Sequence, residues 1–91
     1  MTPEELRDRV DSRETFLAFL KSLQRDREEE LAKEAASPSS PWGPGHHGWE
    51  NGSIEAFLDA MHAWAVDSNA LPAEPTWRAI AQLFSAGKHY E

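Results

Sequence analysis

Three histidines and a glutamate fall within twenty residues of the chain, and such side chains ligate metals and carry protons. The stretch is GHHGWENGSIEAFLDAMHAW, residues 45–64, and the four side chains are those of His46, His47, Glu50 and His62. A zinc site needs three or four ligands converging within about 2.0–2.2 Å of one ion, usually with part of the set at helical i, i+4 spacing. No two of these residues share a helix at that spacing, and adjacent histidines on an extended chain point apart. The stretch therefore does not predict a metal site, and the three histidines are weak candidates only.

An acid–base or metal-dependent enzyme that uses the same four residues is the alternative function. A pair such as Glu50 and His62 would exchange protons only if the loop folded back onto the following helix, which nothing in the pattern indicates. No serine stands in a nucleophile-elbow context, there is no cysteine, and no glycine-rich phosphate loop follows a strand. The sequence therefore predicts a protein that is not an enzyme and that needs no cofactor.

Length and charge restrict the class of protein and its partners. A chain of 91 residues builds one small core, so we expect a single domain over residues 1–91. The formal net charge of −7 disfavours nucleic acid and anionic membranes as partners and favours a basic protein. The charged first fifteen residues and the absence of an apolar run of about 18 residues predict a soluble cytoplasmic protein.

Hydrophobic spacing predicts an all-α fold. A capping-box signal at Thr2 starts a short helix, and a second start signal at residues 11–14 opens a long one. Two further helices are expected to begin at the caps Ser53 and Thr76, and Gly87 is expected to end the last one in a left-handed conformation. The apolar stripes of the three principal helices are Phe16, Leu17, Phe19, Leu20 and Leu23, then Ile54, Phe57, Leu58, Met61 and Trp64, then Trp77, Ile80 and Phe84.

Two segments separate the second predicted helix from the third. Beyond Leu23 the apolar stripe thins, so residues 24–36 predict a solvated, charged helix extension with a frayed end. Its run Glu28–Glu30 is read as a solvated face, or else as an acidic contact for a basic protein. Residues 37–48, SPSSPWGPGHHG, predict a long loop rich in proline, glycine and serine. The expected fold is thus a small single-domain bundle of three principal helices, a short N-terminal helix and this loop.

The four tryptophans divide into two pairs. Trp64 and Trp77 lie on the apolar faces of predicted helices, so both are expected in the core. Trp49 is expected to fold back over the start of the third helix. Trp42, between two prolines, is either an exposed interface anchor or a ring packed onto its own domain, and the sequence leaves both open.

Three longer motifs carry a family resemblance. They are V-D-S-R-E-x-F-L-x-F-L at residues 10–20, W-E-N-G-S-I-E-A-F-L-D-A-M-H-A-W at 49–64, and T-W-R-x-I-A-x-L-F-x-A-G-K-x-Y-E at 76–91. With these motifs the chain resembles a family of small uncharacterised bacterial proteins, a domain of unknown function. The resemblance implies no activity. It covers the Trp-Glu-Asn motif but does not fix the three histidines, so a histidine site would be peculiar to this chain.

The residues marked by these motifs are the predicted binding residues. They are Trp49, Glu50, Asn51, Tyr90 and Glu91, to which the loop adds Trp42. A structural role is also open, in which Asn51 and Ser53 cap the third helix and Tyr90 packs on the core. As a surface, the set is acidic and aromatic and suits a partner that carries Lys or Arg. We therefore expect a non-enzymatic interaction module, of which a regulator or an immunity-type inhibitor is one form by analogy, with homodimerisation as a further alternative.

Overall fold

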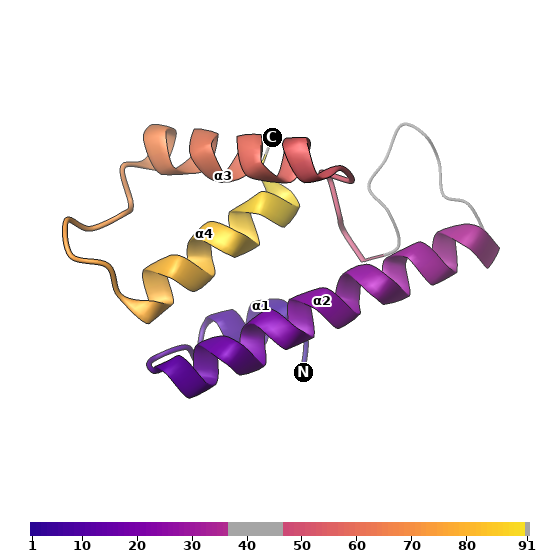
Figure 1. Cartoon of the computed structure of the whole chain (residues 1–91), viewed down its shortest axis with the longest axis horizontal. Coiled ribbons are helices and arrows are strands. Elements are labelled where there is room, and N and C mark those ends of the chain that lie inside the picture. Colours follow the sequence, from indigo (N-terminus) through magenta and orange to yellow (C-terminus); the bar gives the residue numbers. More distant parts are fainter. Residues whose placement is uncertain (37–46, 91) are drawn as a thin grey trace.

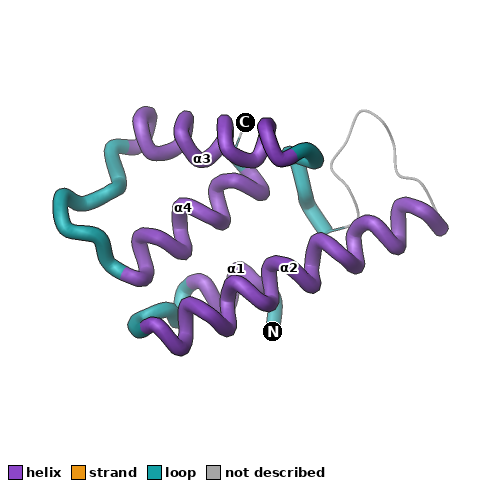
Figure 2. Tube along the Cα trace, viewed as in Figure 1, coloured by secondary structure: helices purple, strands orange, loops and turns teal. Residues whose placement is uncertain are grey.

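The computed structural model of the chain describes residues 1–36 and 47–90, which form four α-helices (Figure 1). They are α1 (Pro3–Arg7), α2 (Arg13–Ala36), α3 (Ile54–Ser68) and α4 (Trp77–His89). These residues contain no strand, so the predicted bundle of three principal helices and a short N-terminal helix is confirmed (Figure 2). Over the same ranges, no helix has the length and apolar character that crossing a membrane requires. Most of the predicted 37–48 loop lies outside the described residues.

Side-chain caps set the start of the helices, as the sequence predicts. Thr2 Oγ1 accepts a hydrogen bond from the backbone of Glu5 at 3.2 Å, and the Glu5 carboxylate accepts one from the backbone of Thr2 at 3.1 Å. Ser53 and Thr76 each accept a backbone hydrogen bond three residues on, which satisfies an amide that the first turn would leave unpaired. At its far end α3 stops on Asn69, whose left-handed backbone (φ 51°) breaks the helix.

Helix α4 occupies the centre of the arrangement. It packs against α3 on one side and against α2 on the other, and α1 contacts both α2 and α4. The backbones of α2 and α3 do not approach each other, and both helices are held through α4 (Figure 1). This leaves room between α2 and α3.

The core lies where α1, α2 and α4 meet. Phe16 is its aromatic centre, with its ring centroid 6.2 Å from that of Phe19 and 6.0 Å from that of Phe84. Trp77 contacts the same ring at 5.5 Å but remains exposed, so the expectation of a buried Trp77 is met only in part. Trp64 is half-buried. The buried cluster is Val10, Phe16, Phe19, Leu23 and Ala81.

The prediction that Gly87 ends the last helix is wrong. Gly87 lies inside α4, which continues to His89 before Tyr90 turns to an extended conformation. A Cβ atom at position 87 would lie 2.6 Å from Cε2 of Phe57, far inside van der Waals contact. Glycine is therefore needed for the close approach of α3 to α4 and not for a left-handed turn.

The charged helix extension predicted over residues 24–36 is present and most of its residues are exposed, but its inner face is covered. The segment is helical to Ala36, and the buried face of α2 continues through it with acidic side chains in place of apolar ones. Asp26 and Glu30 follow Leu23 at i+3 and i+7, and Glu30 is fully covered. The inner face of α2 therefore continues beyond Leu23, but its side chains change from apolar to charged.

Candidate functional site

A buried lysine forms the centre of a polar network. The side chain of Lys88, in the last turn of α4, is only 2% exposed. Its ammonium donates to Oδ2 of Asp26 at 2.6 Å and to Oε1 of Glu4 at 3.0 Å. It also lies 5.4 Å from the centroid of the Trp49 ring. A cation removed from water needs such partners, because burial of an unpaired charge is very unfavourable.

Asp26 collects two further hydrogen bonds. The indole of Trp49 donates to its Oδ2 at 2.8 Å, and Nδ1 of His47 donates to its Oδ1 at 2.7 Å. On the other side of the imidazole, Lys33 lies 2.9 Å from Nε2. Since an ammonium can only donate, Nε2 must accept from Lys33, and the hydrogen of the ring sits on Nδ1. Both ring nitrogens of His47 are thus engaged within the protein.

The remaining carboxylates tie the network to three helices and a loop. The backbone amide of His47 donates to the buried Glu30 at 2.6 Å, which attaches the loop before α3 to α2. Nε2 of His89 donates to Glu4 at 2.7 Å, which attaches α1 to the end of α4. The network therefore fixes the relative positions of α1, α2, α4 and the segment that leads into α3.

Hydrogen bonding holds the pKa values of two of these carboxyls below their ordinary range. Burial raises the pKa of Asp26, but the hydrogen bonds from Lys88, His47 and Trp49 together outweigh it, and the pKa is lowered. The same balance of burial against the hydrogen bonds from Lys88 and His89 lowers the pKa of Glu4. Ionisation of both carboxyls therefore stabilises the folded protein.

The protein is therefore expected to lose stability in acid. A carboxyl with a lowered folded pKa stabilises the fold fully above its unfolded pKa, and this contribution is lost as the pH falls through the folded value. From ordinary values of 4.5 for Glu4 and 3.8 for Asp26, the loss should begin below about pH 4.5. Urea unfolding from pH 7 to pH 3 measures it, and Asp26→Asn should reduce the slope in this window. Equal slopes for the variant and the parent protein would contradict the assignment.

The Trp-Glu-Asn motif closes the C-terminal end of α4. The backbone amide of Glu50 donates to the carbonyl of Lys88 at 3.0 Å. The side-chain amide of Asn51 donates to the carbonyls of Gly87 at 3.0 Å and Tyr90 at 2.8 Å. Asn51 thus caps the end of α4, whereas the sequence suggested that it caps the start of α3. The motif satisfies carbonyls that a helix end leaves open and joins the two helices.

The structure places the other predicted site residues apart from one another. Tyr90 donates its hydroxyl hydrogen to Asp67 at 2.6 Å, which raises the pKa of the phenol. His62 is exposed on α3. In the part of the chain that the structure describes, no three His, Asp or Glu side chains converge as metal ligands. The candidates Trp42, His46 and Glu91 lie outside that part.

Sequence reasoning missed the two central residues, Asp26 and Lys88. A signal for both was present in the helical spacing. Lys88 follows Phe84 by four residues and Ala81 by seven, so it continues the inner face of α4. Asp26 continues the inner face of α2 in the same way. A charged residue on an otherwise buried stripe indicates an internal partner of opposite charge.

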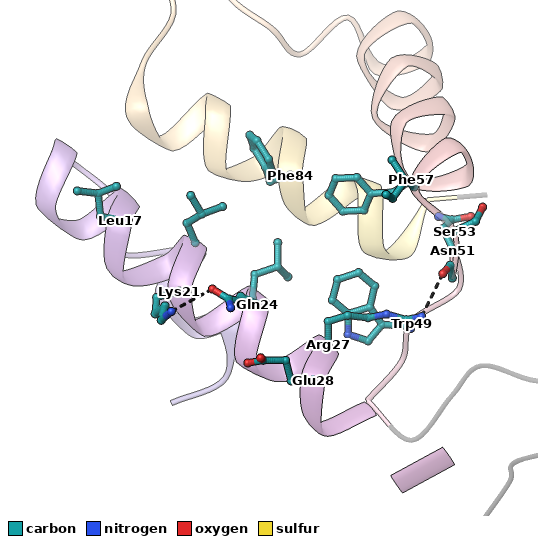
Figure 3. Close-up of a pocket in the computed structure, with 14 residues that line it drawn as sticks. Leu17, Lys21, Gln24, Arg27, Glu28, Trp49, Asn51, Ser53, Phe57 and Phe84 are labelled. Carbon is teal, nitrogen blue, oxygen red and sulfur yellow. Dashed lines mark hydrogen bonds between the residues drawn. The ribbon is translucent and has the colours of Figure 1, made fainter. Parts of the chain in front are cut away.

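An open apolar groove lies beside the network, between α2 and α3, with a volume of about 700 Å³. Figure 3 shows Phe57 and Phe84 projecting from α3 and α4 toward the space that Leu17 borders from α2. The apolar side chains that line it are Leu17, Leu20, Leu23, Trp49, Ile54, Phe57 and Phe84.

Trp49 belongs to both the network and the groove. Its ring is stacked on Phe57 with 6.3 Å between centroids, and the guanidinium of Arg27 lies 5.3 Å from its centroid. Arg27 also donates to the carbonyl of Gly52 at 3.0 Å. The indole nitrogen of Trp49 thus anchors the ring to Asp26, while the ring also lines the groove.

Fold and site together define a small all-α domain in which a buried ion-pair network holds three helices beside an open apolar groove. The model of a family of unknown function (DUF7660) matches residues 12–91, and the chain belongs to this family. No curated protein and no solved structure matches the chain. The matched segment contains Asp26, Trp49 and Lys88, whereas Glu4 precedes it.

Proposed function

We propose that the protein is a non-enzymatic protein-interaction module that binds a basic protein partner. The observation that supports this is the apolar groove, whose walls leave large aliphatic side chains in solvent. Ile54 is 77% exposed and Leu17 is 43% exposed, and both line the groove. A contiguous exposed apolar surface of this kind is typical of interaction sites.

Charge supports a basic partner. The chain carries a formal net charge of −7. Helix α3 contributes Ile54 and Phe57 to the groove. Its charged side chains, Glu55, Asp59 and Asp67, lie outside the lining, and it contains no lysine or arginine. Such a surface attracts a cationic protein over long range and repels an anionic one. A regulator or an immunity-type inhibitor of a basic partner is the finer form of this proposal, by analogy of charge and size.

The predicted binding residues take different parts in this proposal. Trp49 lines the groove, and Asn51 keeps the groove's wall in place through its contacts with α4. The exposed Glu50 adds negative charge beside them. Replacing Trp49 would remove the hydrogen bond to Asp26 as well as the groove surface, so it tests folding together with binding.

One observation favours the alternative of an acid–base enzyme. His47 is oriented by the carboxylate of Asp26, an arrangement that positions an imidazole for proton transfer. Its second nitrogen, which would face a substrate, is instead 2.9 Å from the ammonium of Lys33. Binding is the better supported function for this reason.

Capture of partners from a lysate of the source organism tests the proposal. Tethered parent protein should retain a stoichiometric basic protein at low salt and release it at high salt. The double variant Glu55→Gln/Asp59→Asn should retain markedly less, because it removes two of the three carboxylates of α3. Glu14→Gln/Glu74→Gln changes the net charge equally at exposed sites outside α3 and serves as the control. Absence of a stoichiometric partner, or equal retention by both double variants, would contradict the proposal.

A further inference from the structure

We infer that His47 exchanges its partner on α2 when it takes up a proton, from Lys33 to Glu29, and that it keeps the segment leading into α3 docked in both states. This is a conformational device within the fold, and it does not depend on the proposed protein partner. It follows from the hydrogen-bonding geometry at the two ring nitrogens and from the charges around them.

The neutral ring of His47 has one arrangement of its hydrogen that fits the surroundings. Nδ1 lies 2.7 Å from Oδ1 of Asp26, and because a carboxylate can only accept, Nδ1 carries the hydrogen. Nε2 lies 2.9 Å from the ammonium of Lys33 and accepts from it. The contact with Lys33 therefore requires an unprotonated Nε2.

A second carboxylate lies beside Lys33. Oε2 of Glu29 is 3.9 Å from Nε2 of His47. Glu29 and Lys33 are four residues apart on α2, so their side chains reach the ring from adjacent turns of one helix face. The side chain of Glu29 is 64% exposed and that of His47 is 16% exposed, so the carboxylate can move toward a ring that is held in place.

Protonation removes the acceptor that Lys33 uses. When a proton from solvent binds Nε2, both ring nitrogens become donors. The ammonium of Lys33 keeps its three hydrogens but loses its acceptor, and two positive groups would remain 2.9 Å apart. The exposed Lys33 then turns to water, and Glu29 approaches Nε2 to about 2.7–2.9 Å, the usual length of a charge-assisted hydrogen bond to a carboxylate.

The segment stays docked because its other attachments do not use Nε2. Nδ1 still donates to Asp26, and the backbone amide of His47 still donates to Glu30. Asp26 also accepts from the indole of Trp49, so the ring that lines the groove keeps its anchor. Histidine ordinarily changes its charge between pH 5 and pH 8. The groove is therefore expected to keep its shape over this range.

The charged groups around the ring come from three helices. Those of α2 contact His47 directly, and they are Asp26, Glu29, Glu30 and Lys33. Those of the other two helices are linked to it through Asp26, and they are Lys88 and His89 of α4 and Glu4 of α1. Among the direct contacts the carboxylates outnumber the ammonium, so a protonated ring has an acceptor at each nitrogen.

Imidazole ¹⁵N nuclear magnetic resonance of the full chain at pH 8 and pH 5 tests the exchange, and His47→Asn identifies the His47 signals. At pH 8 we expect a hydrogen on Nδ1, none on Nε2, and a nuclear Overhauser effect between the ring and the Lys33 side chain. At pH 5 both nitrogens should carry hydrogen and the Lys33 effect should be lost. The effect between the rings of Trp49 and Phe57, whose centroids are 6.3 Å apart, should persist.

Two variants separate the partners of Nε2. Glu29→Gln removes the acceptor of the protonated ring, and Lys33→Met removes the donor to the neutral ring. Glu28→Gln and Lys21→Met are the controls, because they remove the same charges from α2 at positions that line the groove. All four side chains are exposed, so the variants should fold as the parent does.

The ratio of protonated to neutral His47 is compared at the pH where the parent is half protonated. Relative to its control, Glu29→Gln should lower this ratio about two- to fivefold, and Lys33→Met should raise it by a similar factor, as expected for partly exposed ion pairs.

Four outcomes would overturn the inference. The first two are a hydrogen on Nε2 at pH 8 and an Nε2 that still lacks one at pH 5. The third is a Lys33 contact that persists at pH 5, or variants that match their controls, since no exchange of partners would then occur. The fourth is loss of the contact between Trp49 and Phe57 at pH 5, which would show that protonation releases the segment.

Discussion

Replacement of Lys88 by methionine is expected to lower the free energy of unfolding by about 3–5 kcal/mol. The lysine ammonium is almost fully buried and is the shared cation for Asp26 and Glu4. Without it, Asp26 and Glu4 lose their shared ammonium, and of the two only Glu4 keeps a side-chain partner on α4, His89. Methionine keeps most of the volume of the lysine stem, so the loss reflects charge and not packing.

This effect is large for a chain of this length, whose total stability is expected to be about 5–14 kcal/mol. Urea unfolding followed by circular dichroism measures it, and Lys21→Met, at an exposed lysine of α2, is the control. Adding Asp26→Leu to Lys88→Met should restore part of the loss, because an unpaired buried charge is more costly than an apolar replacement of the pair. If Lys88→Met lowered the free energy of unfolding no more than Lys21→Met does, the network would be accessible to water and the assignment would be wrong.

Replacement of Gly87 by alanine is expected to lower the free energy of unfolding by about 1–3 kcal/mol, the cost of overpacking a well-filled site. Alanine gains about 1 kcal/mol over glycine in a helix interior, which acts in the opposite direction. The clash should prevail, since three ring atoms of Phe57 would lie 2.6–2.8 Å from the new Cβ. That ring is held between Trp49 and Phe84, at 6.3 and 6.2 Å between centroids, so it has little room to move.

The destabilisation by Gly87→Ala should disappear or reverse when the Phe57 ring is absent. In a Phe57→Ala background the alanine at position 87 meets no ring, and only its helix propensity remains, so Gly87→Ala should be neutral or stabilise by up to about 1 kcal/mol. Thermal unfolding of the parent protein, the two single variants and the double variant gives the coupling free energy between positions 57 and 87. Stabilisation by Gly87→Ala in the parent protein would contradict the close packing of α3 on α4.

The helices were predictable because their signals are local. Ser53 and Thr76 cap the turns that immediately follow them, and the apolar stripes repeat at the helical period within each element. Gly87 shows the limit of such rules. Its position near a helix end indicated a left-handed stop, but a ring from another helix explains the glycine.

The network was not predictable because it depends on tertiary contacts. Asp26 and Lys88 are separated by 62 positions. Helical spacing places each of them on the inner face of its helix, but only the structure shows that they pair with each other. The Trp-Glu-Asn motif drew attention to Trp49 and Asn51, but only the structure shows that Asn51 caps α4. The groove follows from how three helices pack, which no local pattern records. That Trp49 and Glu50 bind a partner stays a prediction.

Network and groove are coupled through Trp49, whose indole is fixed by Asp26 and whose ring lines the groove. Because buried ion pairs hold its walls, we expect the groove to be preorganised for the proposed partner, with little loss of conformational entropy on binding. The variants of Lys88 and Gly87 test how the helices are held together, and the variants of Glu55 and Asp59 test binding of the proposed partner.

Chemical-shift mapping of the captured basic partner on the isotope-labelled protein tests the proposed function most directly. The methyl signals of Leu17 and Ile54 and the ring signals of Phe84, which all line the groove, are expected to shift as the partner is added. Shifts confined to α1, with the groove signals unperturbed at saturating partner, would contradict the proposed function.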